Sequence, residues 1–276
     1  MAAGAWTSRI GAALVVTLGV AGPASATQDL VKARLLSETS AVKPGGTAWM
    51  AVELAMKPGW HTYWRNPGDA GQPTDILWTL PLGYEAGGIA WPVPRPFSVE
   101  FITSYGYEDS VTLLVPVTAP ATAKPGETAT VTADVNWLAC EKICIPGEAK
   151  LSIDLPVAAE APASPDAKPV FAQARALMPA ANSTAATGVA TEDTITLTLP
   201  ATLVGETGEV AFLPFDDALI DHGAPQKLAR GGDAVTLTLK RGPKTGALAG
   251  SFPGLLLVKD KAAPARVAFD LPVTIK

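Results

Sequence analysis

Alternation of apolar and polar residues at every second position is the feature that most constrains this chain. In TATVTADVNWLA (128–139) every second residue is apolar, which predicts a strand with one buried face. Pro-Gly turns such as KPGG at 43 and KPGE at 124 separate runs of this kind. The other predicted strands are 48–56, 75–80, 110–119, 149–157, 194–200, 209–215, 234–241, 254–260 and 265–275. We therefore expect an all-β chain.

The predicted strands fall into two blocks. The N-terminal block (27–157) and the C-terminal block (181–276) each have the short strands and regular turns of an immunoglobulin-like β-sandwich domain. Between them, the segment 158–180 begins in a stretch rich in Pro and Ala, which predicts a linker. The run PVFAQARALM (169–178) has Pro at a first helical position and predicts a short helix. For the C-terminal block we expect a spacer or docking role.

The first 26 residues have the pattern of a secretory signal peptide. Arg9 precedes the apolar run IGAALVVTLGVAG, and ASA at 24–26 offers small residues for cleavage. A membrane anchor is the alternative, but the apolar run is shorter than the roughly 20 residues that a span needs. Every later apolar run is interrupted by Pro, Gly or charge. We expect a mature, soluble protein outside the cytoplasm.

Charge and histidine content exclude several function classes. The 21 basic and 26 acidic residues give a net charge of −5, and no basic cluster suits phosphate, so nucleic acid is not an expected partner. The two histidines, His61 and His222, fall in different blocks. This argues against a Cys/His nucleophile pair and against the usual zinc spacing, and His61 beside Trp60 is expected to be structural. No phosphate-binding or dinucleotide-binding glycine motif occurs. We expect no cofactor and no bound metal.

Both cysteines lie in CEKICIPG (140–147), with three residues between them. Because alternating strands flank this stretch, we predict a hairpin loop that turns at Pro146 and Gly147 and places both thiols at one rim of the sandwich. A disulfide closing such a short loop contributes only ~2 kcal/mol of stability. Lys142 favours a thiolate at its neighbours and Glu141 opposes it. The residues alone leave three readings open: a redox-active pair, a structural disulfide and a metal site.

Four segments together resemble the N-terminal periplasmic domain of the DsbD/ScsB family of thiol:disulfide interchange proteins. They are PGWHTYWRNPGDAG (58–71), WPVPRPF (91–97), SYGYEDSVTLLVPV (104–117) and WLACEKICIPGEAKLSIDLP (137–156). The resemblance covers nearly all of the N-terminal block. The two-block arrangement is similar to the ScsB branch of the family.

The resemblance implies roles for individual residues. Cys144 corresponds to the cysteine that forms mixed disulfides with partners, and Cys140 to the resolving thiol. The segment that begins at Ser104 corresponds to a loop that shields the pair, with Tyr105 as the aromatic cover, although the shielding Phe of the family falls on Ser104. The family's DsbD members have five residues between the cysteines, whereas this chain has three. Residues expected to line the site are His61, Tyr63, Glu141, Lys142 and Pro146.

The resemblance also implies partners and a class of reaction. It implies a protein-disulfide reductase component in the periplasm that passes electrons to thioredoxin-fold proteins of the isomerase or reductase type. Because no membrane or thioredoxin-like part follows in this sequence, we expect a separate membrane protein to donate the electrons. Two alternatives stay open. One is a non-enzymatic binding or assembly protein with a structural disulfide. The other is copper handling, since two thiolates suit Cu(I) and the ScsB branch is associated with copper tolerance.

Overall fold

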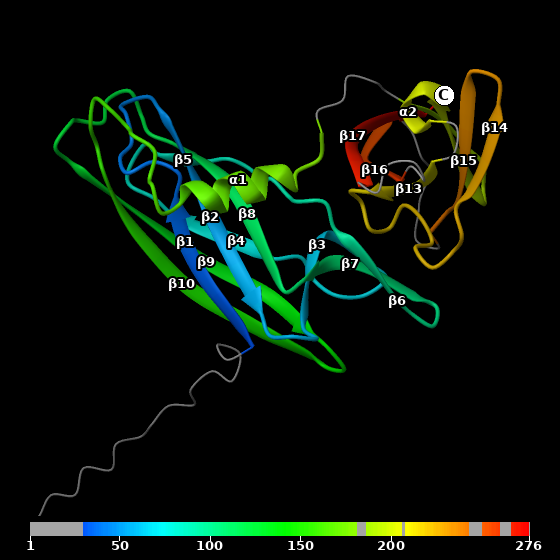
Figure 1. Cartoon of the computed structure of the whole chain (residues 1–276), viewed down its shortest axis with the longest axis horizontal. Helices are drawn as coiled ribbons and strands as arrows, with labels where there is room; N and C mark the ends of the chain where they lie inside the picture. Colours follow the sequence, from blue (N-terminus) through cyan, green and yellow to red (C-terminus); the bar gives the residue numbers. More distant parts are fainter. Residues whose placement is uncertain (1–29, 181–185, 206–207, 243–249, 260–265, 276) are drawn as a thin grey trace, which may run out of the picture.

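The computed structural model describes residues 30–180, 186–205, 208–242, 250–259 and 266–275 of the chain. The expected signal peptide (1–26) lies outside the described residues. Strands dominate the described part, as the alternation predicts (Figure 1). Among the helices of the described part, none is long and apolar enough to cross a bilayer.

Two sheets form the N-terminal block. The first has the order β1-β2-β8-β5, and the second has the order β10-β9-β3-β7-β6 with β4 paired to β9. The strands of the first sheet are β1 (Val31–Ser37), β2 (Thr47–Met56), β5 (Glu85–Ala86) and β8 (Ser110–Thr118). Those of the second sheet are β3 (His61–Gly68), β4 (Asp75–Thr79), β6 (Arg95–Val99), β7 (Ile102–Glu108), β9 (Thr128–Cys140) and β10 (Cys144–Pro156).

The core of this block lies between the two sheets. Strand β9 buries Val131, Ala133, Val135 and Trp137, which is the face that the alternation predicts. Opposite them, β2 contributes buried side chains such as Leu54. The immunoglobulin-like sandwich expected for this block is therefore confirmed.

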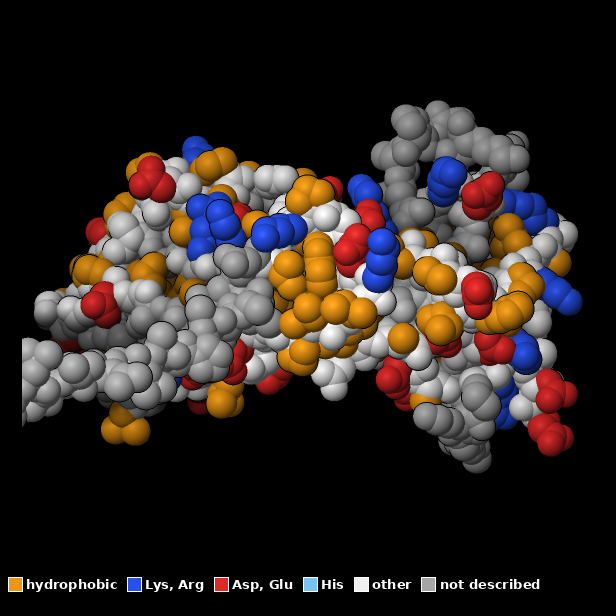
Figure 2. Space-filling model, turned by 90° about the horizontal axis from the view of Figure 1, so that it is seen from below, with side chains coloured by type: hydrophobic (Ala, Val, Ile, Leu, Met, Phe, Trp, Pro, Cys, Tyr) orange, Lys and Arg blue, Asp and Glu red, His pale blue; other side chains and the backbone are white. Residues whose placement is uncertain are grey.

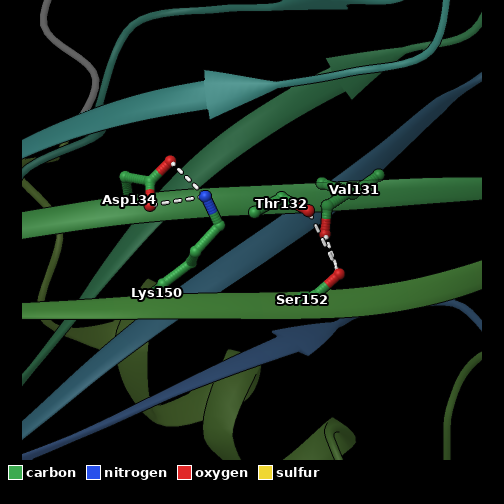
Figure 3. A network of polar contacts seen from close by, with 5 residues as sticks. All are labelled: Val131, Thr132, Asp134, Lys150 and Ser152. Carbon is green, nitrogen blue, oxygen red and sulfur yellow. Dashed lines mark hydrogen bonds and ion pairs between the residues drawn. The ribbon is translucent and has the colours of Figure 1, made fainter.

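Strands β9 and β10 form one long hairpin. Their outward-facing polar residues pair across the ladder: Lys150 Nζ lies 3.3 Å from Asp134 Oδ1, and the Thr132 and Ser152 hydroxyls are 3.1 Å apart (Figure 3). These exposed cross-strand pairs support the register but each contributes little to stability. The hairpin carries the cysteine pair at its end.

The predicted turn at Pro146-Gly147 is wrong. These two residues lie within β10, opposite Leu138 and Trp137, and the chain reverses direction earlier, at residues 141–143. Strand β10 is an edge strand, where a proline without an N–H group is tolerated. A side chain at position 147 would overlap the Trp137 indole, so the glycine makes room for that ring.

Segment 158–180 connects the two blocks but is packed against the N-terminal block along part of its length. Its helix α1 (Lys168–Ala176) matches the predicted run within two residues and buries Phe171 against Ala51 and Leu114, on the outer face of the first sheet (Figure 1). Arg175 near the end of α1 forms an ion pair of 2.7 Å with Glu38. The helix therefore covers the side of the sandwich away from the cysteines.

The strands of the C-terminal block form one sheet of order β13-β16-β17-β11-β12-β15-β14. Its elements are β11 (Ala186–Ala190), β12 (Thr194–Pro200), α2 (Ala201–Val204), β13 (Glu209–Pro214), β14 (Lys227–Gly231), β15 (Ala234–Lys240), β16 (Ser251–Lys259) and β17 (Arg266–Ile275). The sheet curls around a core that includes Leu197, Phe212 and Leu237. The Gln226 side chain accepts from Phe212 N–H and donates to Phe212 C=O, both at 2.8 Å, so it ties the edge strand β13 to the residue before the other edge strand, β14.

The two blocks share a hydrophobic cluster. On one face of β13 and β16, Phe212 and Leu256 pack into the core of the C-terminal block. On the other face, Leu213, Leu255 and Leu257 pack in the same cluster as Trp64 and Trp137 of the N-terminal block. Both faces of β13 and β16 are therefore buried.

Candidate functional site

Cys140 and Cys144 form a disulfide at the end of the β9–β10 hairpin. The two residues are direct cross-strand partners, with S–S 2.02 Å and Cα atoms 4.1 Å apart. Three residues connect them, and Glu141 N–H donates to Ile143 C=O at 3.1 Å. The sequence prediction of a pair at the rim of the sandwich is confirmed, and the bridge does not cross the core.

The two cysteines differ in exposure. Cys140 is 2% exposed because β3 runs alongside it, with His61 as its pairing partner. Cys144 is exposed, and Ile143 before it is 64% exposed. The hairpin turn ends on the underside of the molecule as drawn in Figure 1, and hydrophobic side chains gather near the centre of that face (Figure 2). Another protein can therefore approach the residue Cys144, whereas Cys140 lies behind it.

Tyr63 and His61 of β3 form a short chain of polar contacts that ends at the disulfide. The Tyr63 hydroxyl lies 3.8 Å from Cys144 Sγ, and His61 Nε2 lies 3.3 Å from the same hydroxyl. Burial raises the pKa of Tyr63, so its hydroxyl stays protonated. Burial also lowers the pKa of His61, against a smaller opposing effect of Glu108. The structure thus brings two predicted lining residues to the pair, one of them in contact with a sulfur.

Strand β3 holds Tyr63 in place with the help of a glycine. A side chain at Gly71, where φ is +108°, would overlap the Tyr63 ring, so the loop after β3 packs directly on that ring. In the sequence, this loop and β3 together contain RNPGDAG, which looks like a turn. The sequence therefore does not predict this strand, although it carries Tyr63, which contacts Cys144 Sγ, and His61, which pairs with Cys140.

Phe97 is the aromatic residue on this side of the sheet that sequence reasoning missed. Its ring stacks on His61, with centroids 4.9 Å apart and an angle of 18° between the planes. Phe97 is the cross-strand partner of Ser104, so the two residues share one face. Ser104 Oγ itself donates to Ala70 C=O at 3.1 Å and thereby holds the loop after β3. The sequence signal for Phe97 is its place at the end of WPVPRPF, one of the four segments that resemble the DsbD/ScsB family.

The expected cover by Tyr105 does not agree with its position. Successive residues of a strand face opposite sides, so Tyr105 turns away from the face of Ser104 and Phe97. Its ring is 3% exposed and packs edge-on against Trp64 and against His222 of the C-terminal block. Tyr105 is therefore part of the contact between the blocks.

The remaining predicted site residues lie around the turn. Glu141 and Lys142 are exposed in the loop, and Pro146 is exposed on β10. Gly59, where φ is +86°, brings the chain before β3 close to the Glu141 side chain. Within the described residues no group of three or more His, Cys, Asp and Glu side chains could hold a metal ion.

Comparisons with known proteins found one family model that matches the N-terminal block and solved structures of similar fold. Residues 29–156 match the family model described as "Thiol:disulfide interchange protein DsbD, N-terminal". No curated protein matches the sequence. The solved N-terminal periplasmic domain of ScsB from Proteus mirabilis is similar at 20% identity and TM-score 0.65, over 89% of this chain and 94% of that one. The reduced N-terminal domain of DsbD from Neisseria meningitidis aligns at 12% identity and TM-score 0.29, over 49% of this chain and 92% of that one.

Proposed function

Because residues 29–156 match the family model of the N-terminal domain of DsbD thiol:disulfide interchange proteins, we propose that this chain passes electrons to partner proteins through Cys140 and Cys144. The observation that carries the proposal is the difference in exposure between the two cysteines. Exchange needs one sulfur that a partner reaches and a second that is held close enough to resolve the mixed disulfide. The exposed residue Cys144 and the buried residue Cys140, bonded to each other at the end of the hairpin, support this division of roles.

The proposed reaction starts from the reduced pair. The Cys144 thiolate attacks one sulfur of a partner disulfide, and a mixed disulfide forms while the partner's other sulfur leaves as a thiolate and takes up a proton. The Cys140 thiolate then attacks Cys144 Sγ, which restores the bridge and releases the second partner thiol. Two electrons and two protons pass to the partner, which leaves as a dithiol.

Tyr63 supports this chemistry through its contact with Cys144. In the reduced protein its protonated hydroxyl donates to the Cys144 thiolate and stabilises it. His61 contacts the Tyr63 hydroxyl, and Phe97 stacks on the His61 ring. We assign the shielding role to Phe97 in place of Tyr105, because Phe97 lies on the same face as the pair.

The proposal includes the compartment and the partners. A disulfide persists in an oxidising compartment, and the similar ScsB domain from Proteus mirabilis is described as periplasmic. The periplasm, a cleaved signal peptide, thioredoxin-fold acceptors and a separate membrane donor are all parts of this proposal.

Partner trapping tests the proposal. In the Cys140→Ser variant the thiol of Cys144 has no resolving partner, so mixed disulfides with periplasmic thioredoxin-fold proteins should accumulate. Mass spectrometry of reducible adducts from periplasmic extract would identify them. The matched control is Cys144→Ser, whose remaining thiol is buried and should trap far less. Equal trapping by both variants, or none by either, contradicts the assignment.

A structural disulfide is the second candidate. The direct cross-strand pairing of the cysteines favours it, since such a bridge fixes the register of the β9–β10 hairpin. A Cys140→Ser/Cys144→Ser double variant separates the two functions. It should lose all exchange with partners if the pair is a relay, but keep its role in vivo if the bridge is only structural.

A further inference from the structure

Loop 214–224 of the C-terminal block, which begins at the last residue of β13, touches the strands that surround the disulfide. Asn66 of β3 is fully buried, and its Nδ2 donates to Pro214 C=O at 2.7 Å. Its Oδ1 accepts from Gly68 N–H at 2.8 Å. Since β3 also carries His61 and Tyr63, this amide ties the strand of the redox site to the C-terminal block.

Aromatic contacts reinforce this attachment. Phe215 lies edge-on to Trp64, with ring centroids 5.7 Å apart, and the Arg65 guanidinium lies 4.1 Å from the centre of the Phe215 ring. Trp64 follows Tyr63 directly, and successive residues of a strand face opposite ways. The residue next to the sulfur contact is therefore held by the C-terminal block.

His222 makes the corresponding contact to β7. Its Nε2 lies 2.8 Å from Asp217 C=O, and a carbonyl can only accept, so Nε2 carries the proton. Nδ1, 3.2 Å from the Tyr105 hydroxyl, then accepts in the neutral ring. Gly223 packs directly on the Phe101 carbonyl at the turn between β6 and β7. The hairpin that bears Phe97 is therefore braced at its turn and along β7.

Strands β3 and β7 present one face to the disulfide and the opposite face to the C-terminal block. Tyr63 and Ser104 lie on the first face. Their neighbours Trp64 and Tyr105 lie on the second face, where loop 214–224 contacts them. We propose that loop 214–224 is a positioning element of the redox site. By fixing β3 and the β6–β7 hairpin, it keeps the Tyr63 hydroxyl on Cys144 Sγ and the Phe97 ring over His61. This rests on the proposed exchange function and gives the C-terminal block a task in it.

The proposal predicts that releasing the loop changes the chemistry of a pair it does not touch. In full-length protein, we expect Phe215→Ala/His222→Ala to raise the rate at which dithiothreitol reduces the disulfide by about 2- to 30-fold, the range of coupling between sites without direct contact. In the Cys140→Ser background, the same double change should raise the pKa of the Cys144 thiol, measured by alkylation rate against pH.

Two further variants separate positioning from general loss of stability. Leu197→Ala weakens the C-terminal core without touching the N-terminal block and should leave both readouts unchanged while the protein is folded. His222→Gln keeps an acceptor for the Tyr105 hydroxyl. Its reduction rate and its Cys144 pKa should therefore lie closer to the wild-type values than those of His222→Ala.

The outcomes are distinct from those that test the exchange function. Unchanged rate and pKa in folded Phe215→Ala/His222→Ala protein would overturn the positioning role. Equal changes in Leu197→Ala would overturn it too. If the Cys140→Ser variant traps no partner, the exchange function fails, yet the alkylation profile of Cys144 still reports whether the loop controls the site.

Discussion

Cys140 shows how one contact between strands changes what alternation predicts. The core-facing positions of β9 are 129, 131, 133, 135, 137 and 139, so alternation places residue 140 on the opposite, solvent-facing side of the strand. It is nevertheless buried, because β3 runs beside it there. The sequence predicts the cysteine pair and its place at the rim. The difference in exposure between Cys140 and Cys144 depends on β3, and the Pro-Gly sequence at the end of β3 indicated a turn instead of a strand.

Tyr63 is expected to lower the pKa of Cys144. We predict that Tyr63→Phe, in the Cys140→Ser background, raises the pKa of the remaining thiol by about one unit, since a hydrogen bond to a charged group contributes about 1.5 kcal/mol. Alkylation at pH 7 becomes slower because less thiolate is present. The control is Tyr84→Phe, in a separate core cluster, which should leave the profile unchanged. An unchanged pKa in Tyr63→Phe contradicts the proposed contact.

Phe97 is expected to shield His61, and the contact between the Tyr63 hydroxyl and Cys144 Sγ, from water. In Phe97→Ala, water reaches the imidazole, so the pKa of His61 should rise toward its ordinary value of 6.5 as desolvation is relieved. Reduction of the disulfide by dithiothreitol should become faster. NMR titration and stopped-flow kinetics measure the two effects.

The control for Phe97 lies on the same hairpin. Phe101 is 90% exposed at its turn, and Phe101→Ala should change neither the pKa of His61 nor the reduction rate. If both variants have the same effect, the hairpin acts as a whole and the shielding role of Phe97 is wrong.

At the scale of elements, the hairpin that carries the cysteines was predicted well except at its end. Strand β9 matches within one residue, whereas β10 begins at Cys144, five residues before the predicted start. Pro and Gly usually indicate a turn, but here Gly147 faces the Trp137 ring and Pro146 lies on an edge strand. Local turn chemistry cannot show which glycine lies opposite a tryptophan on the next strand.

Gly147→Ala tests this pairing. The added methyl group must displace the Trp137 indole, so we expect a loss of about 1–3 kcal/mol in the free energy of unfolding. The control is Gly231→Ala, where the new methyl group meets open space and the change should stay within about 0.5 kcal/mol. Denaturant titration of both variants compares them. Equal stability would mean that the ring has room for a side chain.

At the scale of the whole molecule, two blocks and a connecting segment were predicted, but not their contact. The Pro- and Ala-rich composition of residues 156–169 suggested independent domains. The signal for the contact was the run GLLLV (254–258), which is apolar at consecutive positions and therefore suits a strand buried on both faces. Alternation identifies a buried face only when the other face is polar.

The shared cluster predicts that the two blocks unfold together. Leu213, Leu255 and Leu257 lose their packing partners if either block opens, so we expect one calorimetric transition for the full chain. Phe215→Ala should weaken this coupling and separate the transition into two. Two well-resolved transitions in the wild-type protein would show that the contact between the blocks contributes little.

The reduction potential of the Cys140–Cys144 pair tests the exchange function most directly. Equilibration of the full-length protein with a series of thiol/disulfide buffers, followed by quantification of free thiols, gives its value. A pair that exchanges electrons with partner proteins should have a potential above about −300 mV, within reach of thioredoxin-fold partners. A value well below about −300 mV, typical of inert structural bridges, would contradict the proposed relay.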